Sequence, residues 1–280
     1  MKIAVTGASG FIGQYVLADL LVRNATIVAV TRNASRLAGL DGAVRIVEMD
    51  MAHPHRNCYE QMGRPDILIH LAWDGLPHYK SLHHFDSELP RQYQFLKTLL
   101  DAGLPSLLVT GTCFEYGMQS GKLSEDMQPL PGNPYGYAKD ALRRQLTFLK
   151  SNKPFNLTWA RLFYLYGEGQ SPHSLYSQLR QAALRGDARF DMSGGEQLRD
   201  YLPVTEAARQ IVRLALAQRN LGAINICSGT PISVRRLVEQ WLRENHWNIE
   251  LNLGHYPYPD YEPLAFWGDR HRLDTCLEQP

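Results

Sequence analysis

The sequence lacks a charge imbalance, a cysteine pattern and a long apolar run. Lys and Arg together number 29 against 28 for Asp and Glu, so the net charge favours neither nucleic acid nor an anionic membrane as a partner. The cysteines (Cys58, Cys113, Cys227 and Cys276) show no metal-ligand spacing, and we expect reduced thiols, no bound metal and a cytoplasmic location. No apolar run reaches about 18 residues, and strand-like sequence begins at residue 2, so we expect neither a membrane span nor a signal peptide.

Three glycines spaced three residues apart, Gly7, Gly10 and Gly13, follow a short apolar run at residues 3–5. Glycine can turn the chain sharply, admit a phosphate close to the main chain and let a helix pack tightly on a strand. A helix beginning near Phe11 would present free N–H groups and a positive dipole end to an anion. Such turns also occur without a ligand, but the place of this one after an N-terminal strand favours a dinucleotide pyrophosphate.

Internal repeats and low-complexity tracts are also absent, and 280 residues suit one large α/β domain or a nucleotide domain with a smaller partner. Apolar and amphipathic segments alternate in the order of a doubly wound parallel sheet. Strands are expected at residues 2–6, 27–31, 44–48, 66–71, 106–111 and 156–162, and helices at 11–23, 85–103 and 135–150.

The rhythm becomes irregular after about residue 165. Helices are expected at 174–185, 205–218 and 233–244, with a strand at 223–227 that returns to the main sheet. We therefore predict a dinucleotide-binding Rossmann domain of residues 1–165, rejoined by 200–228, and a smaller interleaved substrate-binding region of residues 166–199 and 229–280. The Pro-rich aromatic segment 256–263 is expected to cross the surface as a coil.

Basic residues follow the second expected strand, where an acidic residue would accept hydrogen bonds from the free 2′-hydroxyl of NAD. Arg32 and Arg36 occupy this place. A guanidinium matches a 2′-phosphate in charge and geometry, so the sequence favours NADP(H) over NAD(H), although solvated arginines are common on any surface. Asp50 and Met51, just past the third strand, either contact the adenine edge or form a turn.

Tyr135 and Lys139 are four residues apart and share one face of an expected helix. A free phenol has a pKa near 10, and a neighbouring ammonium and an oxidised nicotinamide would lower it towards neutrality. Thr112 ends the fifth strand at the sheet edge where ligands bind, and its hydroxyl would bond a substrate oxygen. Taken singly, these residues suit a helix surface or a loop cap equally well.

Ordered motifs give the chain a family resemblance. TGASGFIG (6–13), HLAW (70–73), TGTCFEYG (110–117), YGYAK (135–139), RLFYLYG (161–167), RDYLPV (199–204) and INICSGTPISV (224–234) follow one another along the chain. Their order resembles that of extended short-chain dehydrogenases/reductases. The chain is most similar to the NAD-dependent epimerase/dehydratase branch, which acts on nucleotide sugars.

The resemblance implies a catalytic triad of Thr112, Tyr135 and Lys139, in which the tyrosine transfers a proton, the lysine also grips the nicotinamide ribose and the threonine orients the reacting oxygen. It implies a cofactor held by Gly7, Ser9, Gly10, Phe11, Ile12, Gly13, Arg32, Arg36, Asp50, Met51, Leu71, Ala72, Trp73, Tyr135, Lys139 and Phe163. It implies a substrate held by Trp73, Thr112, Cys113, Phe114, Tyr164 and Arg199.

One substrate-side position matches the family pattern and others depart from it. Arg199 matches a residue that contacts the substrate diphosphate, and an inter-domain salt bridge is its alternative role. Tyr164 stands where the family has an asparagine, and the C-terminal diphosphate arginine has only Arg270 and Arg272 as candidates, by charge. Loop 74–84, rich in His and aromatic residues, is expected to line the sugar pocket or to be solvated.

Dehydration is not expected, because Cys and Phe follow Thr112 where family dehydratases carry an Asp-Glu pair. The arginines favour consumption of NADPH, and the compact length resembles the reductases. We therefore expect reduction of the 4-keto group of a nucleotide-diphospho-4-keto-6-deoxy-sugar, with a 4-epimerase as the alternative. A non-catalytic NADP-sensing protein is disfavoured by the Tyr–Lys pair. The resemblance further implies a homodimer, formed by helices near Phe85 and Tyr135, serving deoxysugar and cell-surface polysaccharide synthesis.

Overall fold

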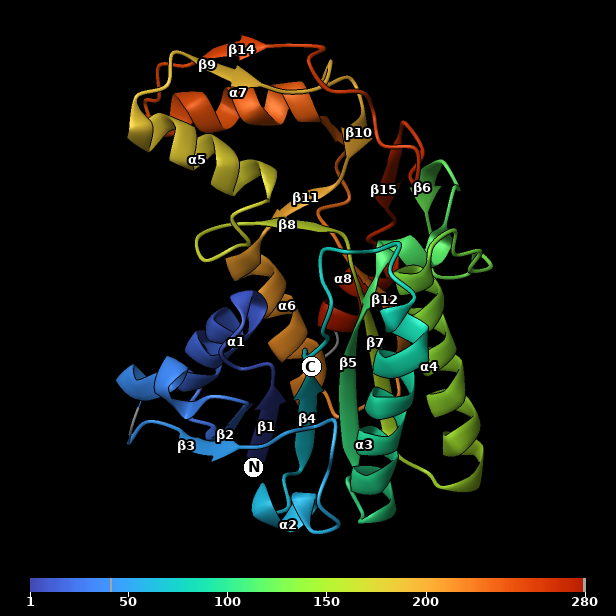
Figure 1. Cartoon of the computed structure of the whole chain (residues 1–280). Coiled ribbons are helices and arrows are strands. Elements are labelled where there is room, and N and C mark those ends of the chain that lie inside the picture. The colour runs from blue at the N-terminus through green and yellow to red at the C-terminus, as the bar shows by residue number, and fades with distance from the viewer. Residues whose placement is uncertain (41, 279–280) are drawn as a thin grey trace.

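The computed structural model describes residues 1–40 and 42–278 (Figure 1). Its centre is a seven-stranded sheet in the order β12-β7-β5-β4-β1-β2-β3, parallel throughout. The strands are β1 (Lys2–Thr6), β2 (Thr26–Thr31), β3 (Arg45–Glu48), β4 (Ile67–His70), β5 (Ser106–Thr112), β7 (Asn156–Leu162) and β12 (Gly222–Ile226). This is the predicted doubly wound Rossmann sheet, and β12 is the strand expected to return to it.

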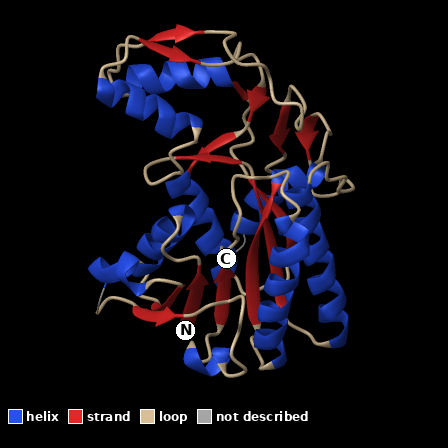
Figure 2. Ribbon diagram, viewed as in Figure 1, coloured by secondary structure: helices blue, strands red, loops and turns tan. Residues whose placement is uncertain are grey.

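Helices cover both faces of the sheet (Figure 2). One face carries α1 (Phe11–Leu21), α6 (Val204–Leu216) and α8 (His271–Glu278), and the other carries α2 (Cys58–Gln61), α3 (Leu89–Asp101) and α4 (Pro134–Asn152). Short 3₁₀ turns lie at η1 (Ala34–Leu40) and η3 (Cys113–Tyr116). Because the sheet is covered on both sides, its strands are apolar in continuous runs rather than alternately.

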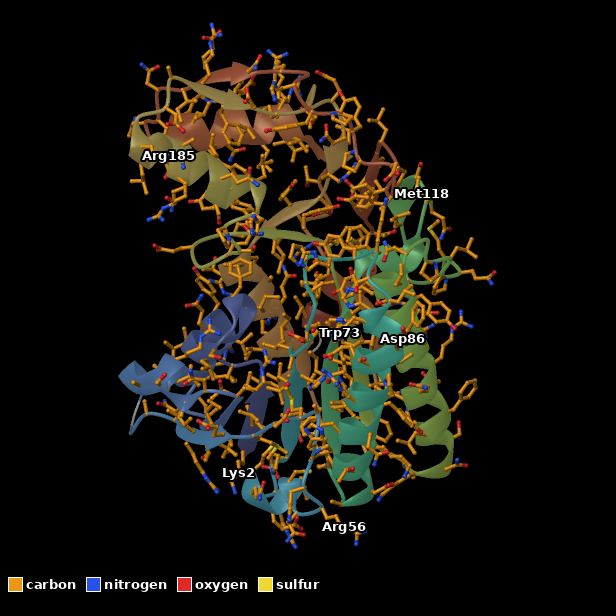
Figure 3. All side chains as sticks on the ribbon, viewed as in Figure 1. Lys2, Arg56, Trp73, Asp86, Met118 and Arg185 are labelled. Carbon is orange, nitrogen blue, oxygen red and sulfur yellow. The ribbon has the colours of Figure 1, made fainter. Side chains whose placement is uncertain are left out.

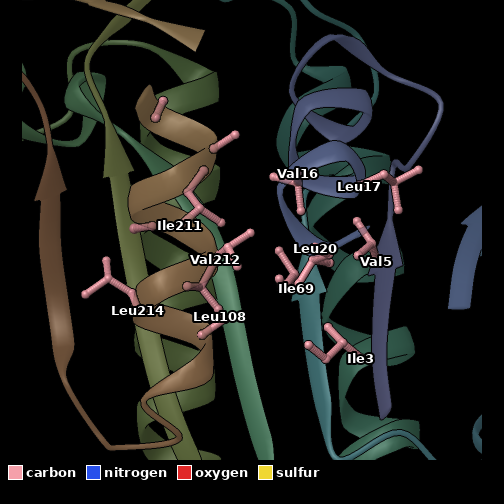
Figure 4. Packing of buried hydrophobic residues seen from close by; sticks show 14 of the residues in the cluster. Ile3, Val5, Val16, Leu17, Leu20, Ile69, Leu108, Ile211, Val212 and Leu214 are labelled. Carbon is pink, nitrogen blue, oxygen red and sulfur yellow. The ribbon is translucent and has the colours of Figure 1, made fainter. Parts of the chain in front are cut away.

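Apolar side chains of α1 and α6 pack against the sheet (Figure 4). The close approach of α1 and of the Ala72 backbone to the first turn explains the glycine spacing. Gly7 has φ +67, and a Cβ there would lie 2.9 Å from the Ala72 nitrogen. A Cβ on Gly13 would lie 2.6 Å from the Ala8 carbonyl oxygen, so α1 approaches the first turn only without a side chain at this position. Two of the three expected glycine roles, the sharp turn and the close helix packing, are thereby confirmed.

The helix expected at 85–103 is present and begins with a π-helical turn. A π-helical turn, η2 (His84–Glu88), precedes α3, in which Pro90 lies in the first turn. Proline has no N–H to donate to the carbonyl four residues back, so the chain enters α3 through a wider turn. This turn sets the end of the loop that follows β4.

A smaller lobe stands over the carboxyl edge of the sheet (Figures 1 and 2). Its core is formed by α5 (Leu175–Arg185), α7 (Val234–Glu244), β9 (Arg189–Asp191) and β14 (Glu250–Asn252). Three strand pairs connect it to the sheet: β8 (Tyr164–Tyr166) with β11 (Tyr201–Pro203), β10 (Leu198–Arg199) with β13 (Ile232–Ser233), and β6 (Gly121–Leu123) with β15 (Phe266–Gly268). No helix among the described residues is long and apolar enough to span a bilayer.

Candidate active site

A cavity of about 550 Å³, here called the glycine cavity, opens at the carboxyl ends of β1, β2 and β4. The N-terminus of α1 faces it, and Gly10 at the N-cap offers no side chain to satisfy the first-turn N–H groups. These donors and the helix dipole suit a pyrophosphate. The predicted cofactor residues that line this cavity are Gly7, Ser9, Gly10, Phe11, Ile12, Gly13, Arg32, Arg36, Asp50, Met51, Leu71, Ala72 and Trp73.

The adenosine end of the glycine cavity is basic. The Arg32 side chain is 69% exposed, and its nearest carboxylate, on Asp74, lies 3.8 Å away. Arg36 lines the same end. Asp50 takes the turn-forming role named above, since its carboxylate accepts from the Ala52 N–H and pairs with His53, whose hydrogen bond lowers the Asp50 pKa.

Tyr135 and Lys139 lie on the buried face of α4, as their spacing predicts. The side chain of Asn133 caps this helix by accepting a first-turn N–H at 2.8 Å. Lys139 Nζ donates to the Thr110 carbonyl at 2.9 Å and lies 4.0 Å from the centre of the Trp73 ring. The glycine cavity therefore ends at Trp73, which is labelled in Figure 3 and whose ring contacts both Lys139 and Tyr135.

Burial controls the ionisation of this pair. It lowers the pKa of Lys139 from 10.5 to about 7, against the opposing carboxylates of Glu115 and Glu88. It raises the pKa of Tyr135 well above its usual range, and the hydrogen bond with Thr112 only partly offsets this. Burial therefore dominates the Tyr135 pKa, while Lys139 donates to the Thr110 carbonyl and lies against the Trp73 ring.

The position of Thr112 is set by a buried acid. Glu115 Oε1 accepts from the Thr112 N–H at 2.9 Å, while its Oε2 accepts from Arg161 at 2.7 Å, and both oxygens accept from the Trp159 indole. The Thr112 hydroxyl in turn accepts from the Phe114 N–H at 3.3 Å. Thr112 is therefore both a loop cap and a neighbour of the Tyr135 phenol, and Glu115 faces the core rather than a ligand.

A second cavity, of about 830 Å³, lies between the sheet and the lobe and is called here the aromatic cavity. Tyr79, Phe114, Tyr164, Tyr201 and Tyr261 are among its lining residues. Residues 76–81 of the loop expected at the sugar pocket also line it, and Phe11 and Leu76 line both cavities. The Tyr79 ring lies 5.6 Å from that of Tyr135, so the Tyr–Lys pair is close to where the two cavities meet.

The comparisons with known proteins agree with this arrangement. Residues 3–227 match the NAD dependent epimerase/dehydratase family over the glycine loop, the Tyr–Lys helix and the returning strand. The chain belongs to this family. It is 29% identical over 270 residues to a dTDP-6-deoxy-L-talose 4-dehydrogenase (NAD(+)) of Aggregatibacter actinomycetemcomitans, covering 96% of this chain and 99% of that protein.

Two further relatives of this epimerase/dehydratase chain are informative. A GDP-6-deoxy-D-talose 4-dehydrogenase of the same organism is 27% identical over 247 residues, 85% of this chain and 78% of that protein. The solved structure of MoeE5 in complex with UDP-glucuronic acid and NAD superposes with a TM-score of 0.83 at 26% identity, covering 99% of this chain and 93% of that one.

Several expected site residues of this family member lie outside the lining of both cavities, the triad Thr112, Tyr135 and Lys139 among them. Arg199 does not line either cavity. Its side chain is 3% exposed and pairs with Glu262 at 2.8 Å, so it takes the ion-pair role in place of the diphosphate role. Cys113 and Phe163 also lie outside both cavities, packed together in a core beneath the lobe.

The two C-terminal arginines are likewise engaged elsewhere. Arg270 pairs with Asp274 at 2.7 Å, and Arg272 pairs with Asp126 at 2.6 Å. Neither lines the glycine cavity or the aromatic cavity. Their charges are therefore directed at the chain's own carboxylates rather than at a ligand.

Some lining residues escape sequence reasoning. Glu262 enters the aromatic cavity from the segment expected to be a surface coil, and Trp241 enters it from the buried face of α7. Arg91 lines the glycine cavity from α3. Composition was the only sequence signal for these residues. A basic residue at the start of a helix, such as Arg91, and an acid in an aromatic stretch, such as Glu262, have many roles and do not indicate a ligand site. In the described residues no group of three or more His, Cys, Asp or Glu side chains is suited to a metal, and all four cysteines are free.

Proposed function

We propose that the chain is an NAD(P)-dependent oxidoreductase that interconverts the C4 alcohol and C4 ketone of a nucleotide-diphospho-6-deoxy-hexose, and that it works as a 4-keto reductase. The observation that carries this proposal is the place of Tyr135 and Thr112, in contact with each other near the junction of the two cavities. The two talose relatives are named as 4-dehydrogenases of 6-deoxy sugars, and reduction at C4 is the reverse of that oxidation.

The chain's residues divide the work as follows. A bound NAD(P)H supplies the hydride that adds to C4. Tyr135 donates its phenolic proton to the oxygen as it becomes an alkoxide, which completes the alcohol, and Thr112 hydrogen-bonds the same oxygen. A buried phenol with a raised pKa holds its proton until such a strong base develops beside it. Lys139 would hold the nicotinamide ribose and return a proton to Tyr135 once the Trp73 ring no longer covers it.

The glycine cavity fits the dinucleotide at its pyrophosphate end but is closed at the reacting end. Trp73 lies over the Lys139 ammonium, and His84 lies 5.2 Å from the Tyr135 ring. For the nicotinamide ribose to reach Lys139, the Trp73 indole has to move away from the Lys139 ammonium. The loop that begins at Trp73 therefore shifts when the cofactor binds.

We also propose that the enzyme accepts NADP(H). Arg32 and Arg36 line the adenosine end of the glycine cavity, and the exposed Arg32 makes a long ion pair with Asp74. A 2′-phosphate would gain charge-assisted hydrogen bonds there. The ratio of kcat/KM for NADPH to that for NADH should fall about tenfold or more in Arg32→Ala. An unchanged ratio would leave NAD(H) as the cofactor.

The homodimer is proposed on the outer face of α4. Phe148 is 73% exposed and Tyr137 is 55% exposed, with Tyr137 packed edge-on to Phe85 from η2. These apolar side chains would be buried by a second copy. Light scattering should give a dimer for the wild type and a monomer for Phe148→Glu, whereas a monomeric wild type would contradict the proposal.

The test of the reaction is NAD(P)H oxidation against a panel of nucleotide-linked 4-keto-6-deoxy-sugars, with the product configuration read by NMR. Tyr135→Phe should lose about 100-fold or more in turnover while still binding NAD(P)H. A variant with near wild-type turnover would remove Tyr135 from the mechanism. Interconversion of two nucleotide sugars without net NAD(P)H consumption would show the 4-epimerase instead. Cofactor binding with no reaction would indicate the NADP-sensing protein.

A further inference from the structure

The segment 256–263 brings one carboxylate into the aromatic cavity. Among the described residues that line this cavity, Glu262 is the single acidic side chain, and it is 8% exposed. The lining around it is largely aromatic, including Tyr164, Tyr201 and Tyr261. In a largely aromatic cavity, a single buried carboxylate is the polar group that can select one ligand over another.

The carboxylate of Glu262 is held in place by hydrogen bonds from two other residues of the chain. Arg199 Nη2 donates to Oε1 at 2.8 Å, and the Tyr164 hydroxyl donates to Oε2. Arg199 is itself anchored, because its Nη1 donates to the carbonyls of Leu198 at 2.8 Å and Leu264 at 3.0 Å. Each carboxylate oxygen has capacity for a second hydrogen bond, so Glu262 can still accept from a ligand in the cavity.

The segment that carries Glu262 lies close to the reacting centre. The ring of the preceding residue, Tyr261, is 6.1 Å from Phe114 and 6.3 Å from Tyr79. These two rings both lie against Tyr135, at 6.3 Å and 5.6 Å respectively. A hexose whose C4 oxygen is held at Tyr135 would therefore extend past Phe114 towards Glu262.

The charge at this end of the cavity is already balanced. The Arg199 guanidinium is neutralised by Glu262 and is closed off from the cavity, and Lys80, which lines the cavity, is paired with Asp260 at 3.0 Å. Among the described residues, the Lys80 and Arg199 charges at this end are already paired with carboxylates of the chain, so Glu262 would repel a ligand carboxylate in this partly dehydrated pocket. A ligand hydroxyl would instead donate to it.

We propose that Glu262 is the specificity-determining residue for the sugar: it accepts hydrogen bonds from the ring hydroxyls of a neutral hexose and rejects a hexuronate. This inference rests on the proposed function and narrows its substrate class. Tyr164 and Arg199 are the positioning residues that hold the carboxylate for this role.

The experiment uses ligands that differ only at C6. UDP-glucose is compared with UDP-glucuronic acid, and the dTDP forms of both sugars are compared in parallel, by calorimetry with the Tyr135→Phe protein and bound NAD⁺ so that no turnover occurs. We expect the neutral sugar to bind about tenfold or more tightly. Glu262→Gln should reduce this preference to about threefold or less, mainly by gaining affinity for the uronate, because the Arg199 charge is then unbalanced.

Two further variants separate charge from shape. Asp260→Asn removes a charge from the same segment outside the cavity and should leave the preference unchanged. Tyr164→Phe keeps the Glu262 charge but loses one support, so it should still reject the uronate while binding the neutral sugar more weakly. This pattern would remain measurable if Glu262→Gln failed to fold.

The outcomes are distinguishable from those of the reaction assay. Equal affinity of the parent protein for both sugars, or an unchanged preference in Glu262→Gln, would overturn the inference. A retained preference alongside a wild type that turns over no 4-keto sugar would refute the proposed function and leave the role of Glu262 standing. If neither the UDP-sugar pair nor the dTDP-sugar pair binds, the inference about Glu262 and the proposed function are both overturned.

Discussion

Lys139→Met tests whether the lysine beside Tyr135 is enclosed as the structure shows. Methionine is similar in length and apolar, so it fills the space under the Trp73 indole without an amine. Burial lowers the pKa of Lys139 from 10.5 to about 7, and the unfolded chain therefore binds more protons than the folded one between these values. The free energy of unfolding should consequently rise with pH in this window.

The magnitude follows from the size of the pKa shift. Raising the pH from 7 to about 9.5 should increase the unfolding free energy of the wild type by about 3 kcal/mol relative to Lys139→Met. Other titrating groups act in both proteins and cancel in the difference. His70, whose pKa is lowered to about 3 by burial, has its effect below this range.

Urea unfolding of the cofactor-free proteins, followed by circular dichroism at four pH values, measures this difference. Lys150→Met is the matched control, because Lys150 lies in the last turn of the same helix, and its curve should parallel that of the wild type. Parallel curves for Lys139→Met and the wild type would refute the reasoning. They would mean that the ammonium keeps its water, and that the Thr110 carbonyl and the Trp73 ring do not enclose it.

Three other predictions follow from single contacts. Binding of NAD(P)H should change the Trp73 emission, so the fluorescence response of the wild type should be largely absent in Trp73→Phe; an equal response in both would show that the indole does not move. Arg161→Met should lower the unfolding free energy by about 3–5 kcal/mol in urea titrations, because it leaves the buried Glu115 without its charge partner, and a smaller loss in Glu115→Gln/Arg161→Met would confirm the coupling. Gly13→Ala should lower stability by about 1–3 kcal/mol and weaken cofactor affinity measured by fluorescence, because the added methyl group pushes α1 away from the first turn; unchanged affinity would contradict this.

The fold was predictable because its signals are local. The run at residues 3–5, the glycines after it and the later apolar segments each report their own backbone state, and all seven strands of the main sheet were expected within a few residues. The π-helical geometry of η2, which leads directly into α3, was not predicted, although Pro90 was visible in the sequence. A proline near a helix start is usually compatible with an unbroken helix.

The candidate site was predictable only in part, because some of its contacts join distant positions. The four-residue spacing placed Tyr135 and Lys139 on one face, but nothing in that spacing indicates that Trp73 lies on the lysine. The partner of Arg199 is 63 residues away in an irregular segment. Periodicity carries no information about such pairs, so the sequence favoured a ligand diphosphate for Arg199 over a salt bridge and could not identify Glu262 as its partner.

In the sequence, the segments that form the lobe lie between the last elements of the sheet domain rather than in one block after it. The chain enters the lobe after β8, returns to lay down α6 and β12, enters again through β13 and returns to finish with β15 and α8 (Figure 1). A single cut at the exposed helix end around Gly186 would leave one piece holding six strands of the sheet and the other holding β12 with two of its covering helices. Neither fragment would contain the whole lobe. Two fragments produced separately would have to associate through the edge of the sheet, so this chain is suited to a fragment-complementation experiment.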